Sequence, residues 1–163
     1  MATTYPSTTS TIADADIRRM AGVNDALLLI GRIVLVVMFI FSGYGKFMDL
    51  SGTAAQIASK GLPAPMLMAS LAATAEVLGG LMIVFGWQTR IAALGLIVYT
   101  GLATYFFHDF WNMPDGPEQM NNMIHAMKNL SIAGAFLMLA AVGAGRYSID
   151  GPCIRHDRTT VAS

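Results

Sequence analysis

Long apolar stretches, separated by shorter polar links, dominate the pattern of this sequence. A helix needs about 20 predominantly apolar residues to cross a bilayer, and four stretches meet or approach that length. None of them alternates apolar and polar residues as the strand of a membrane barrel does. The pattern therefore predicts four membrane-spanning helices, at about residues 26–47, 66–85, 91–107 and 123–142.

The links between these stretches predict how the helices are connected. Residues 86–90 form a tight link, so the second and third helices are expected to be antiparallel neighbours. In the longer first link, Gln56, Ile57 and Ala58 favour a short helix at the membrane interface. A soluble bundle would need a polar stripe on each helix, and residues 91–107 contain no charge. We expect an all-α, antiparallel, integral-membrane four-helix bundle.

The composition supports a membrane protein and excludes other classes. The chain is 55% hydrophobic and 12% charged, whereas about a quarter of the residues in a typical soluble domain are charged. Ten basic residues balance ten acidic ones, so the chain lacks the basic excess of a nucleic-acid-binding protein. The expected partner is the lipid bilayer. The single cysteine, Cys153, excludes an internal disulfide and a cysteine-cluster metal site.

The chain divides into three predicted parts. Residues 1–25 are polar and rich in Thr and Ser, which predicts a disordered N-terminal tail without a signal-peptide pattern. Residues 26–150 hold the four spans as one unit. Residues 151–163 form a charged C-terminal tail.

Arginines and lysines are segregated to opposite sides of the predicted membrane. The lysines are Lys46, Lys60 and Lys128, and the arginines are Arg18, Arg19, Arg32, Arg90, Arg146, Arg155 and Arg158. The positive-inside rule places the arginine side in the cytoplasm. Both termini are therefore expected inside, where Cys153 would remain a free thiol.

Two charged residues lie within the predicted spans, where a charge requires a partner. At 1.5 Å per residue, Glu76 lies roughly 13 Å deep and Arg32 roughly 9 Å deep from the same side. This spacing predicts an Arg32–Glu76 ion pair inside the bundle. The pair has two interpretations, a structural staple between helices or a carboxylate that anchors a ligand or carries protons.

A polar cluster is predicted at the outer membrane face, where the ends of three helices meet. Its residues are Lys46, His108, Asp109, His125, Lys128 and Asn129. Ammonium, imidazole and amide groups can hydrogen-bond the carbonyl oxygens of a quinone between aromatic side chains. The alternative is that these residues only solvate the helix ends.

Metal and cofactor sites are not predicted within the chain itself. His108, Asp109 and His125 could supply three metal ligands, but they follow no metal-binding spacing. Residues 42–46 contain two glycines but do not follow a strand, so they are not a phosphate-binding loop. A quinone is the one ligand that the polar cluster suggests.

Eight short motifs occur in order along the chain. They are Gly31-Arg32, Ser42-Gly43-x-Gly45-Lys46, Ser59-Lys60-Gly61-Leu62-Pro63, Glu76-Val77-x-Gly79-Gly80, Gly86-x-x-Thr89-Arg90, His108-Asp109-Phe110-Trp111, Lys128-Asn129-Leu130 and the segment from Gly145 to Gly151. With these motifs the chain resembles the DoxX family of small four-helix bacterial inner-membrane proteins. Ala135 departs from the family pattern, where a glycine is common.

The resemblance implies an inner-membrane location and an association with redox chemistry, since family members are often described as oxidoreductases. Two hypotheses follow. The chain is a redox-associated subunit that binds quinone and works with a partner redox protein, or it is a non-enzymatic membrane scaffold or small-molecule carrier. Whether it is an enzyme stays open, and small-residue pairs such as Ala75 and Gly79 permit a homo-oligomer.

Overall fold

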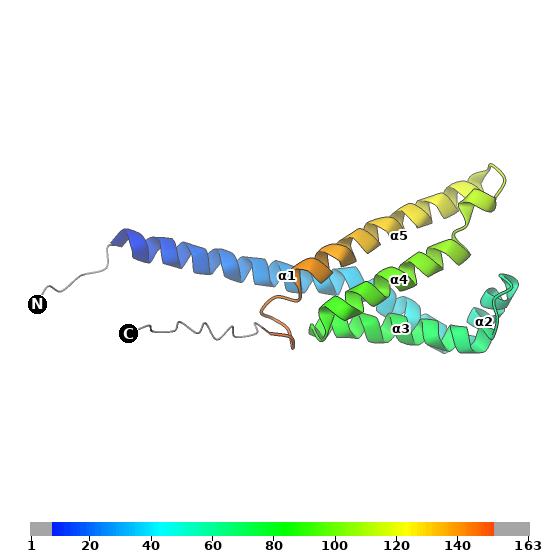
Figure 1. Cartoon of the computed structure of the whole chain (residues 1–163), viewed down its shortest axis with the longest axis horizontal. Coiled ribbons are helices and arrows are strands. Elements are labelled where there is room, and N and C mark those ends of the chain that lie inside the picture. The colour runs from blue at the N-terminus through cyan, green and yellow to red at the C-terminus, as the bar shows by residue number, and fades with distance from the viewer. Residues whose placement is uncertain (1–7, 152–163) are drawn as a thin grey trace, which may run out of the picture.

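The computed structural model of the chain describes residues 8–151. Over that range the regular structure is entirely helical (Figure 1), which confirms the all-α fold class. The elements in order are α1 (Thr8–Met48), α2 (Leu50–Ser59), α3 (Pro65–Phe85), α4 (Thr89–Phe107), the 3-10 helix η1 (Phe110–Asn112) and α5 (Pro117–Val142).

Four of the helices are long and apolar enough to cross a membrane. The four stretches are Gly22–Met48, Pro65–Phe85, Thr89–Asn112 and Pro117–Val142. They confirm the four predicted spans and extend most of them by several residues. Proline occupies the first turn of α3 and of α5, where its missing N–H leaves no helical hydrogen bond unmade.

The short helix predicted around Gln56 is also present, as α2. Its N-cap is Asp49, whose side chain accepts a hydrogen bond from the backbone N–H of Gly52 at 2.8 Å. Ala54 and Ile57 are buried on its inner face and pack with Ala69 of α3. This packing places α2 across one end of the helix bundle.

The prediction of a disordered tail over residues 1–25 is wrong from Thr8 onward, because α1 begins there. No proline interrupts the sequence from Thr8 to Met48, and an existing helix grows by one hydrogen bond for each residue that it adds. The helix that forms the first membrane span, Gly22–Met48, therefore continues beyond the span to Thr8. The rest of that predicted tail, and residues 152–163 with Cys153, lie outside the described residues.

The helices pack as two closely contacting pairs, α1 with α3 and α4 with α5. Between the pairs, Phe39 of α1 and Phe136 of α5 meet edge to face, with their ring centroids 5.3 Å apart. Both rings are buried in the main apolar core. In Figure 1 the two pairs are close near the α3–α4 link and separate toward α2 and η1.

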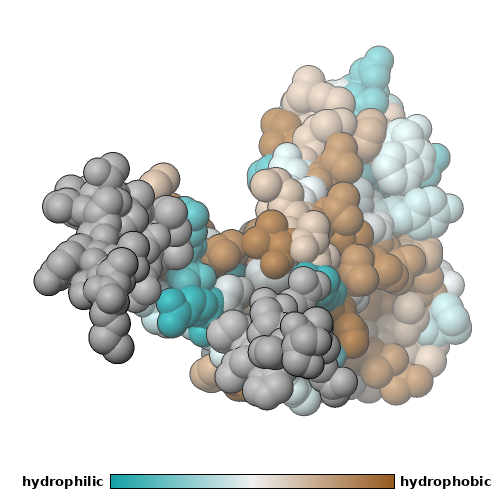
Figure 2. Space-filling model, turned by 60° about the vertical axis from the view of Figure 1, so that its left-hand side comes forward, coloured by the Kyte–Doolittle hydropathy of each residue, from teal (hydrophilic) through white to brown (hydrophobic). Residues whose placement is uncertain are grey.

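Apolar side chains cover much of the outer surface of these helices. Phe41 and Met138 are more than two thirds exposed, and Figure 2 shows hydrophobic residues over most of the described surface in view. A water-soluble protein rarely exposes such continuous apolar area. The surface suits helices whose solvent is lipid, with every backbone hydrogen bond made within the helix.

Candidate functional site

A cavity of about 610 Å³ lies where the two helix pairs separate, lined by residues from α1, α2, α3, α4 and α5. Its walls are largely apolar, and Phe39, Phe106 and Phe107 contribute aromatic rings. Its polar lining is Ser42, Lys46, Thr53, Gln56, Glu76, Tyr99, Thr100, His108, His125 and Asn129. An apolar cavity of this size with a few converging polar groups is the usual form of a small-molecule site.

Glu76 is the centre of the polar lining and is only 5% exposed. Its Oε2 accepts a hydrogen bond from Lys46 Nζ at 2.8 Å, which makes an ion pair. Its Oε1 accepts from the hydroxyl of Tyr99 at 2.7 Å and from that of Ser42 at 3.2 Å. Lys46 Nζ also donates to Ser42 Oγ at 2.6 Å. Both carboxylate oxygens are thus satisfied by donors from α1 and α4, and the contact joins these two helices to α3.

The close approach of α1 to α3 brings these groups together. A side chain at Gly43 would place its Cβ 2.9 Å from the carbonyl oxygen of Ala73 and 2.9 Å from Cβ of Glu76. Glycine at this position therefore lets the two backbones meet. Ser42 and Lys46 flank the contact, one helical turn apart, and so both reach Glu76.

Two histidines stack near the end of the cavity. The rings of His108 and His125 are nearly parallel, at 10°, with centroids 4.9 Å apart. His108 Nδ1 lies 3.2 Å from Oδ1 of Asn122, within hydrogen-bond distance. Asn129 donates to Thr104 Oγ1 at 2.9 Å. These contacts join the end of α4 to the first half of α5.

Four of the six residues of the predicted polar cluster line the cavity, namely Lys46, His108, His125 and Asn129. The other two face elsewhere. Asp109 pairs with Lys60 at 3.0 Å, between the end of α2 and the end of α4. Lys128 is exposed beside a shallow apolar groove on another face of α5. The structure thus brings together part of the cluster and adds Glu76 to it.

The predicted Arg32–Glu76 ion pair does not form. Arg32 is buried, and its Nη2 donates a hydrogen bond to the backbone carbonyl of Tyr147. The C-terminal segment that contains Tyr147 packs against the middle of α1, where Asp150 also attracts the guanidinium. Lys46 is the partner of Glu76 instead, because its side chain turns back along α1 toward Ser42.

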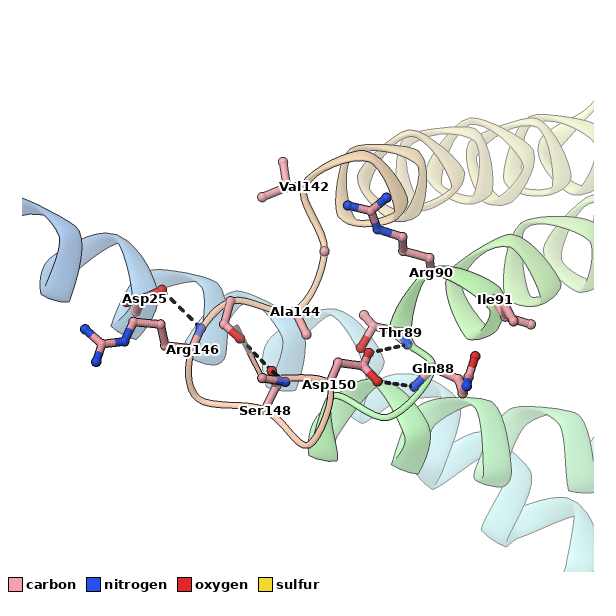
Figure 3. Close-up of a pocket in the computed structure, with 13 residues that line it drawn as sticks. Asp25, Gln88, Thr89, Arg90, Ile91, Val142, Ala144, Arg146, Ser148 and Asp150 are labelled. Carbon is pink, nitrogen blue, oxygen red and sulfur yellow. Dashed lines mark hydrogen bonds between the residues drawn. The ribbon is translucent and has the colours of Figure 1, made fainter. Parts of the chain in front are cut away.

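The segment 143–151 packs at the opposite end of the bundle, beside the α3–α4 link, where it lines a second pocket (Figure 3). Asp150 accepts hydrogen bonds from the backbone N–H groups of Gln88 at 2.8 Å and Thr89 at 2.9 Å, and so caps α4. Desolvation raises the pKa of Asp150, but these two hydrogen bonds and the charge of Arg32 together lower it by a larger amount. Its pKa therefore lies below the ordinary value. Asp25 accepts from the backbone N–H of Arg146 at 3.2 Å.

Sequence reasoning missed five polar residues of the cavity, namely Ser42, Thr53, Gln56, Tyr99 and Thr100. Tyr99 and Thr100 are among the few polar residues of an otherwise apolar span, which was the available signal. Ser42 lies four residues before Lys46 and shares its helix face. Over residues 8–151, no group of three or more His, Cys, Asp or Glu side chains is placed to hold a metal ion.

Known proteins resemble this chain over most of its length. The DoxX family profile matches residues 27–109. The inner membrane protein YphA of Escherichia coli (strain K12) is 45% identical over 124 residues, which cover 76% of this chain and 88% of that protein. The inner membrane protein YqjF of the same organism is 39% identical over 131 residues, covering 80% and 95% of the two chains.

A more distant similarity is partial. The Surfeit locus protein 4 homolog of Schizosaccharomyces pombe (strain 972 / ATCC 24843) is 29% identical over 70 residues, which cover 42% of this chain and 23% of that protein. No solved structure matches the chain. The two bacterial relatives match nearly their whole length, whereas the yeast protein shares only a fragment.

Proposed function

The chain belongs to the DoxX family of inner-membrane proteins, and on that premise we propose that it binds a quinone in the cavity between its helices. The observation that carries this proposal is the buried Glu76, which holds Lys46 at the cavity wall within a membrane-spanning region. A carboxylate at that depth is expensive. The position of this carboxylate beside an aromatic-walled cavity favours ligand binding over a role in packing alone.

The hydrogen-bonding capacity of Lys46 supports a carbonyl ligand. A lysine ammonium carries three N–H donors, and two of them are used by Glu76 and Ser42. The third is available to a ligand in the cavity, where a quinone carbonyl oxygen would accept it. Lys46 and Glu76 also neutralise each other, so the site suits an uncharged ligand.

The redox role in this proposal requires a partner. The sequence has one cysteine and no dinucleotide or haem motif. A quinone takes up electrons together with protons, so a partner redox protein would deliver the electrons. The chain itself binds the quinone head, and we expect protons to enter from water through His108 and His125, which line the cavity.

The test is extraction of bound lipids from the detergent-purified protein, with mass spectrometry and a visible spectrum. We expect about one quinone per chain in the wild type, and a loss of at least tenfold in Lys46→Ala and His125→Ala. Lys128→Ala is the matched control, because Lys128 lies on the same helix as His125 but outside the cavity. It should retain the quinone.

A protein that carries no quinone, and gains none when quinone is added, would contradict the proposal. The non-enzymatic alternative, a scaffold or small-molecule carrier, would then be favoured. A stable partner protein without redox cofactors would support it further.

The proposal includes an orientation with both termini in the cytoplasm. In the described part of the chain, Arg32, Arg90 and Arg146 gather at the end covered by the segment 143–151. Lys46 and Lys60 lie toward the α2 end. Under the positive-inside rule the arginine end faces the cytoplasm. A C-terminal fusion should therefore fluoresce with green fluorescent protein and stay inactive with alkaline phosphatase.

A further inference from the structure

Some residues of the cavity wall are also on the outer, apolar surface of the helices. We propose that the ligand enters the cavity sideways from the bilayer, and that its apolar tail stays in the opening between the helices. The inference rests on the proposed function. It adds the route of entry and narrows the ligand class to a lipid-soluble amphiphile, a quinone head that carries a long apolar tail. Short water-soluble analogues lack the tail that this opening accommodates.

The lipid side of the cavity is open and apolar. Met38 of α1, Leu71 of α3 and Leu102 of α4 all line the cavity, and they are 51%, 59% and 53% exposed. Leu71 and Leu102 lie roughly 8–9 Å from the nearer ends of their helices, at 1.5 Å per residue. At that depth the surroundings are hydrocarbon, so these exposed side chains border openings toward lipid.

Helix α2 and one ion pair lie across the end of the cavity nearest to water, where Gln56 is exposed. The helix α2 contributes Thr53, Gln56 and Ile57 to the cavity wall, and Ile57 is anchored in the apolar contact with α3. The Lys60–Asp109 ion pair ties the end of α2 to the end of α4 at 3.0 Å.

The histidine pair adds to this cover. The stacked rings of His108 and His125 join α4 to α5 at the same end of the cavity. A bulky apolar molecule would have to break this stack or the Lys60–Asp109 pair in order to arrive from water. Entry of the same molecule through the opening toward lipid would break neither contact.

The size and polarity of the cavity favour a ligand with a tail. Three of its polar groups, Ser42, Lys46 and Tyr99, converge on Glu76, and its volume is about 610 Å³. That space encloses a ring head group and the first part of a chain, whereas a long isoprenoid tail is larger. The remaining tail must leave through an opening, and the apolar rim of Leu71 and Leu102 matches it chemically.

The test compares two ways of obstructing access in the full-length protein in lipid nanodiscs. Leu71→Trp and Leu102→Trp enlarge the residues at the lipid opening. Lys60→Cys with Asp109→Cys, in a Cys153→Ser background, allows a bifunctional thiol cross-linker to lock the water-facing end. The probe is a benzoquinone with a long isoprenoid tail, supplied in donor vesicles, and the measurement is its rate of transfer to the protein by mass spectrometry.

We expect each tryptophan variant to slow the transfer at least tenfold and the cross-linked protein to match the wild type. Leu130→Trp is the matched control, because Leu130 is 68% exposed and does not line the cavity. It should leave the rate unchanged. Thermal unfolding of every variant checks that the protein is folded. The two tryptophan variants test the lipid opening from different helices, Leu71→Trp from α3 and Leu102→Trp from α4.

The opposite result overturns the inference. If the cross-link stops the transfer while both tryptophan variants match Leu130→Trp, the ligand enters from water. Equal binding of a tailless benzoquinone would contradict the ligand class. A wild-type protein that takes up neither quinone would overturn the proposed function itself, so the two failures are distinguishable.

Discussion

Lys46 and Glu76 lie thirty residues apart in the chain, and their side chains meet at 2.8 Å between α1 and α3. Glu76 is almost fully buried, whereas a quarter of the Lys46 side chain remains exposed, and Lys46 lines the cavity. Ser42 and Tyr99 supply the remaining hydrogen bonds to the carboxylate. The pair therefore links the packing of two membrane helices to the polar wall of the ligand site.

The first prediction concerns the energy of this pair. Removing one partner of a buried ion pair costs about 3–5 kcal/mol, and the partial exposure of Lys46 should reduce this to about 2 kcal/mol for Glu76→Met. Lys46→Met should cost more than Glu76→Met, because it leaves the buried carboxylate of Glu76 without its cation. The double variant should recover at least half of the loss, because no uncompensated charge remains. Unfolding in detergent, followed by circular dichroism, measures all three.

The Lys60–Asp109 pair is the control for this prediction. It is a third exposed on the lysine side and a quarter on the aspartate side. Such pairs contribute about 0–1 kcal/mol, so Lys60→Met should change stability by less than Lys46→Met. A double variant at positions 46 and 76 that is as unstable as the sum of the single variants would show that the pair is not coupled.

The second prediction concerns the contact at Gly43. An added Cβ would lie 2.7 Å from Cγ2 of Val77 and 2.9 Å from the carbonyl oxygen of Ala73. Gly43→Ala should therefore separate α1 from α3 and lower stability by about 1–3 kcal/mol. Gly45→Ala is the matched control, because nothing lies within 4 Å of its added Cβ. It should be neutral or slightly stabilising, and equal effects at both positions would contradict the packing argument.

Much of the fold could be predicted from the sequence, because long apolar stretches have few alternatives in a membrane. The four spans and the short helix around Gln56 follow from hydropathy and the link residues. The helical extension from Thr8 could not be read in the same way. Polar, Thr-rich segments have weak helix propensity, and the continuation depends on a helix that is already formed.

The site was predicted less completely than the fold. Sequence spacing placed Arg32 and Glu76 at compatible depths, but depth alone does not choose between partners. The C-terminal segment provides the hydrogen-bond acceptor for Arg32, in a contact across 115 positions. No local pattern reports such a contact. Lys46 was identified as a site residue, yet its pairing with Glu76 depends on how α1 and α3 pack at Gly43.

The third prediction concerns Arg32 as the anchor of the C-terminal segment. Arg32→Met removes the hydrogen bond to the carbonyl of Tyr147. The amides of Ile149 and Asp150 donate to the carbonyls of Phe85 and Gly86, and these bonds should open more often without the anchor. We expect hydrogen exchange at both amides to become at least tenfold faster. Arg90→Met changes an exposed arginine at the same end, and similar exchange in both variants would contradict the role of Arg32.

The last prediction concerns the pH dependence of the cap on α4. The pKa of Asp150 is lowered in the folded protein, so its stabilising effect is fully present above the unfolded value of about 3.9 and is lost as the pH falls through the lower folded value. An exposed N-cap of this kind contributes about 0.5–1 kcal/mol. Asp150→Asn should therefore be less stable than the wild type at pH 7, and the difference should shrink below about pH 4.

Thermal unfolding across this pH range measures the difference between the two proteins. Asp115→Asn changes an exposed aspartate in the link before α5 and serves as the control. If Asp150→Asn and the wild type lose stability in parallel on acidification, protonation of Asp150 does not control the cap. The prediction is supported if the stability difference from the wild type shrinks on acidification for Asp150→Asn but not for Asp115→Asn. The acid sensitivity of this end of the bundle would then depend on the hydrogen bonds from Gln88 and Thr89.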